Sequence, residues 1–476
     1  MRTIQIVNVR WFNATAWYGL YLAKLLQDSG NETLVVTLPH TANWQKAKEF
    51  GFDPIDLPFN SKNPLVAPQA YYSLRRLVKK FKPQVINCHR GEGFVLCALL
   101  REQLKSFALV RTRGDQRLPK NNIPNLVLHK YATDAIIATN SRMANHFKQN
   151  MGIAPQLVHT ILGGVDTKRF CFNLEGRARV RAEFGFSDSS YVIGLLGRYD
   201  DVKGQLDLIR ATALLRAQLA KLANLANWGS TSRIAGATSV AITASTPNVA
   251  STANSVNRAN VSGSLNPAGS SDLSGSSDLS GSSDLPGEFG ESGSSGSSGM
   301  SGISGMPGIS DSLGFPGASG SLAYPDVHLL FIGHPTPHFS QSRLEECAKQ
   351  EGIADFVHFT GQRSDVPDCL SALDAGVVAS LWSEAIARAA LEIMACGRPL
   401  ISTTVGVMPD LLPPEAMYEP GDWQGLAAKL AMLIGQDEFK QTLLADIANR
   451  MPGLTNQSFL NSTLQVYNAA LEKAGC

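Results

Sequence analysis

Two glutamates, Glu384 and Glu392, stand eight positions apart in the stretch SEAIARAALEIMACGRPLIST. The pattern predicts that Glu384 lies just before a helix and that Glu392 lies about two turns inside it. One carboxylate can accept hydrogen bonds from both hydroxyls of a ribose diol, and a second can hold the hydroxyls of a sugar. Backbone N–H groups near Ile386, Ala387 and Arg388 would form a helix N-terminus, a natural seat for a diphosphate. Taken alone, the pair also fits two solvated glutamates on a helix surface.

A second pattern, LLGRYDDVKG, places two cations after a predicted strand that ends at Gly197. Arg198 and Lys203 follow the strand, and Gly204 opens the next helix. Two cations at the carboxyl end of a strand can neutralise a leaving diphosphate. Ordinary surface cations are the alternative interpretation.

Short apolar runs separated by amphipathic stretches must position these groups. Such alternation is typical of βαβ units and a parallel sheet. In the first half we expect strands at 4–9, 33–39, 83–88, 107–112 and 134–140. The pattern restarts with strands at 192–197, 327–333, 356–361, 375–380 and 399–404, and with a long helix over 204–223. Two doubly wound α/β domains would face a central cleft, at the carboxyl ends of both sheets.

The second α/β domain is interrupted by a Ser/Gly-rich tract over 227–321, which contains a six-residue repeat, GSSDLS. Few large apolar side chains leave little burial to offset chain entropy. We therefore expect a disordered, low-complexity insertion, and a binding element is the alternative.

Length and composition exclude several classes of protein. A chain of 476 residues is too long for one core and indicates two or three domains. Its 42 Lys and Arg nearly balance 40 Asp and Glu, so no basic field points to nucleic acid. The seven cysteines lack CxxC spacing, which favours a reducing compartment over a zinc site or disulfide framework. No secretory signal and no uninterrupted apolar run of roughly 18 residues is found, so we expect a cytoplasmic protein.

The first two patterns, with their flanks, resemble motifs of the retaining GT-B glycosyltransferases of family 4. SEAIARAALEIMACGRPLI resembles the family's E-x7-E signature, and GRYDDVKG is similar to its GRxxxxKG segment. The resemblance implies two Rossmann-like domains and a nucleotide-diphospho-sugar donor. It implies Glu392 on the ribose, Arg198 and Lys203 on the diphosphate, and Glu384 on the sugar, with Arg198, Lys203 and Glu384 in the catalytic set.

Further segments extend the resemblance over both α/β domains. FTGQRSDVPDCLSALDAGVVASLWSE is similar to the family's run from the base-binding loop to the donor site, so Gln362 and Arg363 would hold the base. Asp374 stands where the family has a similar aspartate; we favour a role in orienting its turn over substrate contact. ILGGVDTKRF, residues 161–170, resembles the family's NGVDxxRF, which lies ahead of the interdomain linker.

Some positions depart from the family pattern. The usual Gly-Gly loop after the first strand is replaced by VRWFNATAWYG, in which the small residues Ala14 and Thr15 indicate close backbone approach. Arg113 stands where many members place a histidine, and His89 follows the preceding strand. We assign these four residues to the acceptor side, with a structural role as the alternative for His89. EAIAR also replaces the common EGFGL, so the contacts to the donor sugar differ.

A basic helix with Arg75, Arg76, Lys79, Lys80 and Lys82 has apolar residues interleaved. Such a face could rest on the anionic inner face of a membrane that carries lipid-linked acceptors. A solvated helix face is the alternative.

The sequence thus predicts a retaining glycosyltransferase that acts on an acceptor hydroxyl, for which a cell-envelope glycan or lipopolysaccharide is our working choice. No cofactor other than the donor substrate is expected, and no metal, because no DxD cluster stands at a strand end. Predicted boundaries are an acceptor-side domain at 1–172, a donor-binding domain at 188–226 and 322–455, and a helix at 456–476 that returns to the first domain. A nucleotide-sugar epimerase or phosphorylase on a similar scaffold, and a non-catalytic nucleotide-sugar-binding protein, are the alternatives.

Overall fold

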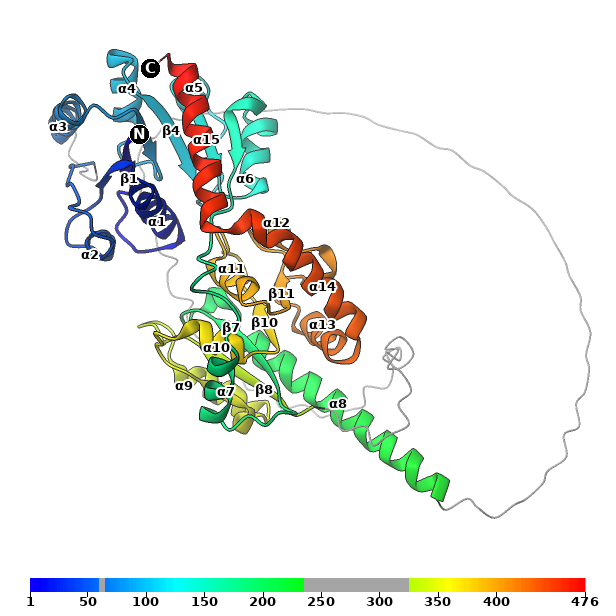
Figure 1. The fold of residues 1–476 in the computed structure, drawn as a ribbon. Helices are drawn as coiled ribbons and strands as arrows, with labels where there is room; N and C mark the ends of the chain where they lie inside the picture. The colour runs from blue at the N-terminus through cyan, green and yellow to red at the C-terminus, as the bar shows by residue number, and fades with distance from the viewer. Residues whose placement is uncertain (60–64, 235–324, 476) are drawn as a thin grey trace, which may run out of the picture. The chain divides into compact units, whose positions relative to one another are not determined.

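The structure is a computed structural model that describes residues 1–59, 65–234 and 325–475 (Figure 1). For residues 225–234 it describes the backbone alone. Most of the predicted insertion, from residue 235 to residue 321, lies outside the described residues. Apart from residues 231–234, the described parts of both halves belong to one compact unit.

Within the described first half, six strands form one parallel sheet in the order β2-β1-β3-β4-β5-β6. The order reverses between β1 and β3, and ligands of such sheets bind beyond the carboxyl ends at this point. Central side chains such as Ile4, Ile86 and Val110 are fully buried, as expected for a sheet covered on both faces. The strands are β1 (Arg2–Ile6), β2 (Glu32–Val36), β3 (Val85–Cys88), β4 (Ala108–Arg113), β5 (Ala135–Ala138) and β6 (Val158–Thr160).

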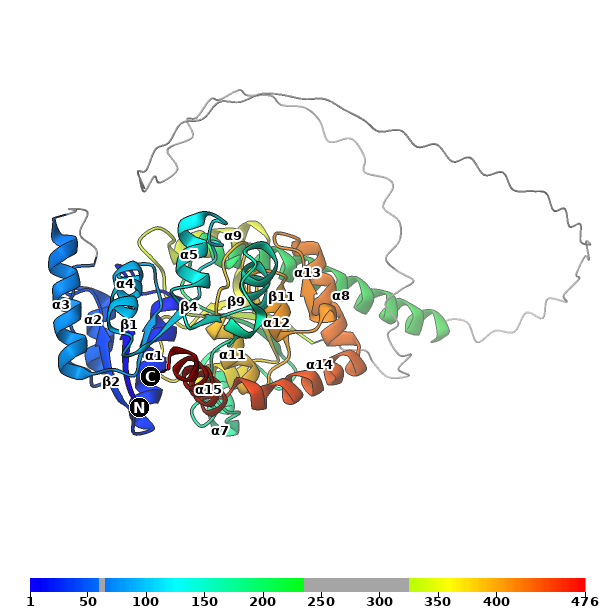
Figure 2. The same cartoon turned by 90° about the horizontal axis from the view of Figure 1, so that it is seen from above.

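The helices of this half follow the strands in turn. They are α1 (Ala14–Asp28), α2 (Ala42–Glu49), α3 (Val66–Phe81), α4 (Phe94–Leu104), α5 (Ile123–Lys130) and α6 (Ser141–Asn145). The basic helix α3 lies beside α4 (Figure 2), and the Tyr71 hydroxyl on α3 donates a hydrogen bond to Gln103 on α4 at 2.5 Å.

The second half repeats the arrangement, with the order β12-β11-β10-β7-β8-β9. Here the order reverses between β7 and β10, the two strands that precede the predicted cations and Glu384. The strands are β7 (Tyr191–Leu196), β8 (Val327–Ile332), β9 (Val357–Phe359), β10 (Ala375–Val378), β11 (Leu400–Thr403) and β12 (Met417–Tyr418). The helices are α7 (Leu174–Glu183), α8 (Gln205–Ile234), α9 (Gln341–Gln350), α10 (Val366–Ala372), α11 (Arg388–Ala395), α12 (Met408–Leu411), α13 (Trp423–Gly435), α14 (Asp437–Arg450) and α15 (Asn456–Ala474).

The predicted fold class, two Rossmann-like α/β domains, is confirmed by these two sheets. The short edge strands β6 and β12 were not predicted, because runs of two or three residues carry little pattern. The helix expected to end at residue 223 continues to Ile234, so residues 227–234 are helical rather than disordered.

The last helix, α15, packs on the first sheet beside β4 (Figure 1). Its apolar face buries Phe459, Leu460 and Val466. The buried Tyr467 hydroxyl accepts a hydrogen bond from Asn87 on β3 at 2.8 Å and one from Gln5 on β1 at 3.2 Å. Among the described residues, no helix is both long enough and apolar enough to span a membrane.

Candidate functional site

The loop after β7 carries Arg198 and Lys203 and turns sharply at Gly204. Gly204 has a φ of +65°, and a Cβ added there would lie 2.0 Å from the carbonyl oxygen of Ala379, just beyond β10. Because any side chain would collide with that oxygen, glycine is required at this close approach. The turn therefore holds Lys203 against the segment that leads to Glu384.

Glu384 is buried, and two donors fix its carboxylate. The Lys203 ammonium contacts Oε1, and the Ser380 hydroxyl donates a hydrogen bond to the same oxygen at 2.7 Å. At the backbone, the Val407 amide donates to the Glu384 carbonyl at 2.8 Å. A Cβ at Gly406 (φ +67°) would lie 1.9 Å from that carbonyl, so this contact also depends on glycine. The orientation of Glu384 is therefore set from both ends of the residue.

Glu392 lies on α11, which begins at Arg388. It is a little over one turn inside the helix, not two turns as predicted, because the helix starts later than the sequence pattern indicated. The side chain of Glu392 is almost fully buried and accepts a hydrogen bond from Arg388 Nε at 2.8 Å. Burial raises the pKa of Glu392, and the neighbouring Arg388 opposes that rise. The Arg388 guanidinium also stacks 4.4 Å from the ring centre of Trp17 on α1.

The N-terminus of α11 depends on an unusual backbone conformation. Ala387, the residue before the helix, is left-handed, with φ 46° and ψ 49°. The first N–H groups of α11 have no partner inside the helix, and anions bind readily at such positions. Ile386, by contrast, is buried in an apolar cluster with Tyr18 and Phe459 of α1 and α15.

One pocket of about 260 Å³ brings together Arg198, Lys203, Glu384 and Glu392. We call it the α11 pocket; Phe12, Asn13, Ala14, Trp17, Leu196, Gly197, Ile386, Ala387, Arg388 and Ala389 complete its lining. A second pocket of about 290 Å³, here the β4 pocket, shares five of these residues and reaches the loop after β4. It is lined by Asn13, Ala14, Thr15, Gly114, Asp115, Gln116, Arg198, Val202, Lys203, Ser383, Glu384 and Ala385.

The α11 pocket has three cations and two carboxylates in its lining, a set that suits a ligand with both anionic groups and hydroxyls. The Arg198 side chain is 53% exposed and pairs with Asp200 at 2.9 Å. A larger pocket of about 680 Å³ lies beside the first half of α14. Carboxylates such as Asp437 and Asp446 line it and no cation does, so it does not suit a diphosphate.

The residues predicted for the acceptor side fall into two groups. Ala14 and Thr15 line the β4 pocket, and the Thr15 hydroxyl donates to the Gly114 carbonyl at 3.1 Å. Arg113 lies just outside it and pairs with Asp115 at 3.6 Å. His89 is fully buried in the first sheet. Its Nε2 lies 2.9 Å from Gln5 Oε1, an arrangement that suits a structural residue.

The two residues predicted to hold the base, Gln362 and Arg363, line neither the α11 pocket nor the β4 pocket. Gln362 is exposed. The Arg363 guanidinium is occupied by ion pairs to Glu183 at 2.6 Å and Asp365 at 2.8 Å. A third pocket of about 240 Å³ leads from Glu392 toward Val366 at the end of this loop.

Sequence reasoning missed four residues that complete the site: Asn13, Trp17, Asp115 and Ser380. Asp115 had a usable signal, because an aspartate two positions beyond a strand end in a doubly wound sheet points toward the ligand side. For Trp17 the sequence holds no comparable signal, since its partner Arg388 is distant in the chain.

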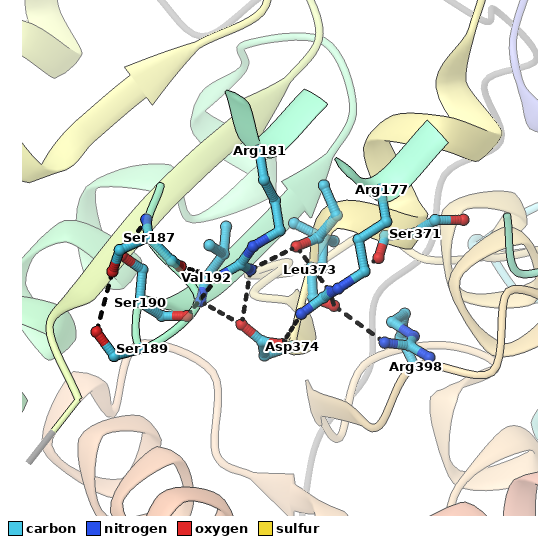
Figure 3. Close-up of polar contacts among 11 residues, drawn as sticks. Arg177, Arg181, Ser187, Ser189, Ser190, Val192, Ser371, Leu373, Asp374 and Arg398 are labelled. Atoms are coloured by element: carbon cyan, nitrogen blue, oxygen red, sulfur yellow. Dashed lines mark hydrogen bonds and ion pairs between the residues drawn. The ribbon is translucent and has the colours of Figure 1, made fainter. Parts of the chain in front are cut away.

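Asp374 lies at the amino ends of β7 and β10, whereas the α11 pocket is lined by residues that follow the carboxyl ends of these strands. Figure 3 shows Asp374 together with Arg177 and Arg181 of α7. Its carboxylate pairs with Arg177 at 2.7 Å and Arg181 at 3.2 Å, and accepts a hydrogen bond from the Val192 amide at 2.8 Å. These contacts clamp α7 to the sheet, which supports the structural role we favoured.

Comparisons with known proteins agree with this architecture. Residues 16–169 match the family model described as Glycosyltransferase Family 4, and residues 318–436 match the one described as Glycosyl transferases group 1. A segment of 90 residues is 36% identical to the lipopolysaccharide core biosynthesis mannosyltransferase LpsB of Rhizobium meliloti (strain 1021). The match spans 18% of this chain and only 25% of that relative.

Two solved structures share the fold over nearly the whole chain. A glycosyltransferase from Rickettsia africae has a TM-score of 0.68 at 14% identity, covering 99% of this chain and 98% of that chain. Anabaena HepE in complex with UDP has a TM-score of 0.66 at 15% identity, covering 98% of this chain and 100% of that chain.

Proposed function

Because this chain belongs to the group 1 and family 4 glycosyltransferases, we propose that it transfers a sugar from a nucleotide-diphospho-sugar to an acceptor hydroxyl. The observation that carries the proposal is the convergence of Arg198, Lys203, Glu384 and Glu392 on the α11 pocket. These groups come from two loops and a helix at the switch point of the second sheet, where ligands of such sheets bind.

The donor occupies the α11 pocket in this proposal. Glu392 accepts hydrogen bonds from the ribose hydroxyls, and the free N–H groups at the start of α11 receive the diphosphate. Arg198 and Lys203 neutralise the diphosphate, and Glu384 holds hydroxyls of the donor sugar. The base extends into the third pocket toward Val366, near the loop of Gln362 and Arg363.

Transfer then forms a bond between the acceptor oxygen and the anomeric carbon while the bond to the β-phosphate oxygen breaks. The hydroxyl proton passes to the departing phosphate, and the anomeric configuration is retained. Arg198, Lys203 and the N-terminus of α11 stabilise the charge that develops on the leaving diphosphate. Preorganised donors of this kind contribute roughly 10²–10³ in kcat each.

The relatives suggest which substrates to try first. One similar structure, Anabaena HepE, was solved with UDP-glucose, and the matched curated relative is a lipopolysaccharide core mannosyltransferase. We propose UDP- or GDP-linked hexoses as donors and a cell-envelope saccharide or lipopolysaccharide intermediate as acceptor. No metal ion is required in this scheme.

The test begins with thermal stabilisation of the purified chain by UDP, GDP and ADP, because a ligand that binds only the folded state raises its stability. The matching nucleotide sugars are then assayed for nucleoside diphosphate release with and without saccharide acceptors, and NMR of the product reports the anomeric configuration. Stabilisation by one nucleotide with acceptor-dependent release is expected. Epimerised donor without an acceptor would identify an epimerase, and binding without turnover would identify a non-catalytic protein.

We also propose a peripheral contact with the cytoplasmic membrane face through α3. Arg76, Lys79, Lys80 and Lys82 are exposed, whereas Ala70, Leu74 and Val78 face the core. Apolar side chains on these two neighbouring helices are exposed as well: Tyr72 on α3 (66%) and Val95 and Leu99 on α4 (49% and 57%). Cations beside apolar groups are typical of surfaces that bind anionic bilayers.

Cosedimentation with vesicles tests this contact. Vesicles with phosphatidylglycerol should bind the chain at low salt and release it at high salt, whereas neutral vesicles should not bind it. A variant with Arg76, Lys79 and Lys80 changed to Gln should lose binding without losing nucleotide stabilisation. Equal binding of the wild type and this variant would contradict the proposal.

A further inference from the structure

The β4 pocket holds one carboxylate contributed by the first sheet. Asp115 follows β4, and its side chain is 16% exposed at the pocket wall. The other lining residues from this half, Asn13, Ala14, Thr15, Gly114 and Gln116, carry no charge. On the opposite wall stand Arg198, Lys203 and Glu384, which the proposed function assigns to the donor.

Two arginines hold Asp115 in place. Arg90, which follows β3, contacts Oδ1, and Arg113 lies 3.6 Å from Oδ2. Arg90 is itself 3.7 Å from Glu92, so two cations and two carboxylates form a nearly neutral cluster. These contacts fix the position of the Asp115 carboxylate, and its remaining lone pairs can accept a hydrogen bond from a group in the pocket.

The backbone of this loop is fixed as well. The Thr15 hydroxyl donates to the Gly114 carbonyl at 3.1 Å, and a Cβ at Gly114 would lie 3.3 Å from both Thr15 and Thr139. Asp115 therefore extends from a packed support, which is what a residue that orients a substrate requires.

We propose that Asp115 binds a hydroxyl of the acceptor and that the acceptor unit in the β4 pocket is an uncharged sugar. This proposal rests on the proposed function, and it specifies the chemical class of the acceptor. A bound diphosphate neutralises Arg198 and Lys203 on one wall of the β4 pocket. On the other wall, Asp115 is the charged lining residue that the first half supplies. A carboxylate accepts hydrogen bonds from sugar hydroxyls, whereas it has no hydrogen-bond donor to offer a phosphate or a carboxylate on the acceptor.

The experiment measures acceptor binding directly. Saturation-transfer difference NMR is recorded for the full chain with UDP or GDP and with methyl glycosides of glucose, galactose and mannose, or with glucose 6-phosphate. We expect signals from at least one neutral glycoside and a weaker response from glucose 6-phosphate. Asp115→Asn should weaken glycoside binding roughly tenfold or more, because it replaces a charged hydrogen bond.

Two controls separate this role from a structural one. Glu92→Gln removes a carboxylate of the same cluster that lines neither pocket, and should leave glycoside binding unchanged. Nucleotide-induced stabilisation should be equal in the wild type and Asp115→Asn. Unchanged glycoside binding in Asp115→Asn, or tighter binding of the anionic sugar, overturns the assignment, as does a wild type that binds no neutral glycoside. The chain could also bind a glycoside through Asp115 and yet release no nucleotide from any donor. That result would contradict the proposed function and would still support Asp115 as a sugar-binding residue.

Discussion

The Lys203 ammonium contacts the carboxylate of Glu384, although 181 positions separate the two residues in the sequence. Lys203 closes the turn after β7 and Glu384 follows β10, and these two strands are neighbours in the second sheet. The pair stands where the α11 pocket and the β4 pocket meet. Proposed donor and acceptor subsites therefore share one ion pair, so charge on Lys203 affects both.

Arg198→Ala should lower kcat by roughly 10²–10³, because the substitution removes one of the two cations that we propose stabilise the leaving diphosphate. The fold should be unaffected, since the Arg198 side chain is 53% exposed. Turnover of the best donor and the melting temperature check both statements. Lys349→Ala, which removes an exposed cation from α9, is the matched control. Wild-type turnover in Arg198→Ala would refute the assignment of the site.

Glu392→Gln should weaken nucleoside diphosphate binding by roughly ten- to a hundredfold, because an amide is a poorer acceptor for two ribose hydroxyls than a carboxylate. Isothermal titration with UDP or GDP measures the change. Glu346→Gln on α9 serves as the control, since it lines none of the pockets named above. The affinity for the normal nucleotide is compared with that for the 2′,3′-dideoxy nucleotide. If the ratio of these two affinities is the same in Glu392→Gln and in the wild type, Glu392 does not contact the ribose.

The sequence allowed the four charged groups of the α11 pocket to be predicted, because each stands in a local motif at the end of an apolar strand. The strands β7 and β10 were recognised as strands, and strand order then brings their loops together. Asp115 and Trp17 escaped prediction, since their importance depends on which loops of the two halves share a pocket. Pairing between distant segments leaves no periodic trace in a single sequence.

Backbone conformation was equally inaccessible. The stretch EAIAR was expected to give a helix N-terminus, but the pattern did not reveal that Ala387 is left-handed or that α11 begins at Arg388. Likewise, Gln362 and Arg363 were assigned from resemblance, and nothing in the local sequence indicated that Glu183, 180 positions away, pairs with the guanidinium of Arg363.

Ala387→Gly should stabilise the fold, by up to about 1 kcal/mol, because a left-handed alanine is strained by roughly 1–2 kcal/mol and glycine is not. Part of the gain is offset by the greater entropy of the unfolded glycine chain. Urea denaturation measures the free energy of unfolding. Ala395→Gly, at the other end of α11, is the control and should cost about 1 kcal/mol. A loss of stability in Ala387→Gly equal to that in the control would show that Ala387 is not left-handed.

Asp374→Asn should lower the free energy of unfolding by about 3 kcal/mol, because it leaves two largely buried arginines without their carboxylate. Nucleotide affinity should not change, since Asp374 lies at the opposite end of β10 from the α11 pocket. The pair of Asp326 with Arg216 provides the contrast, because the Asp326 side chain is 50% exposed, and Asp326→Asn should cost under about 1 kcal/mol. Equal losses in the two variants would contradict the clamp on α7.

Burial next to Arg111 lowers the pKa of His89 from an ordinary value of 6.5 to about 3. Below pH 6.5 His89 therefore becomes protonated in the unfolded chain, whereas in the folded chain it stays neutral down to about pH 3. Between these two pH values the unfolded state binds more protons than the folded state. The contribution of His89 to the free energy of unfolding is therefore fully present above pH 6.5 and is lost as the pH decreases toward about 3.

His89→Gln should reduce the slope of unfolding free energy against pH by up to about 1.4 kcal/mol per pH unit between roughly pH 6 and pH 4. Glutamine can still donate to Gln5 Oε1, so the buried contact has a replacement. Urea denaturation at several pH values gives both slopes. The same change at His129, whose pKa burial lowers to about 4, should also reduce the slope. Parallel curves for His89→Gln and the wild type would mean that His89 is protonated in the folded chain, and its place in the core of the first sheet would have to be abandoned.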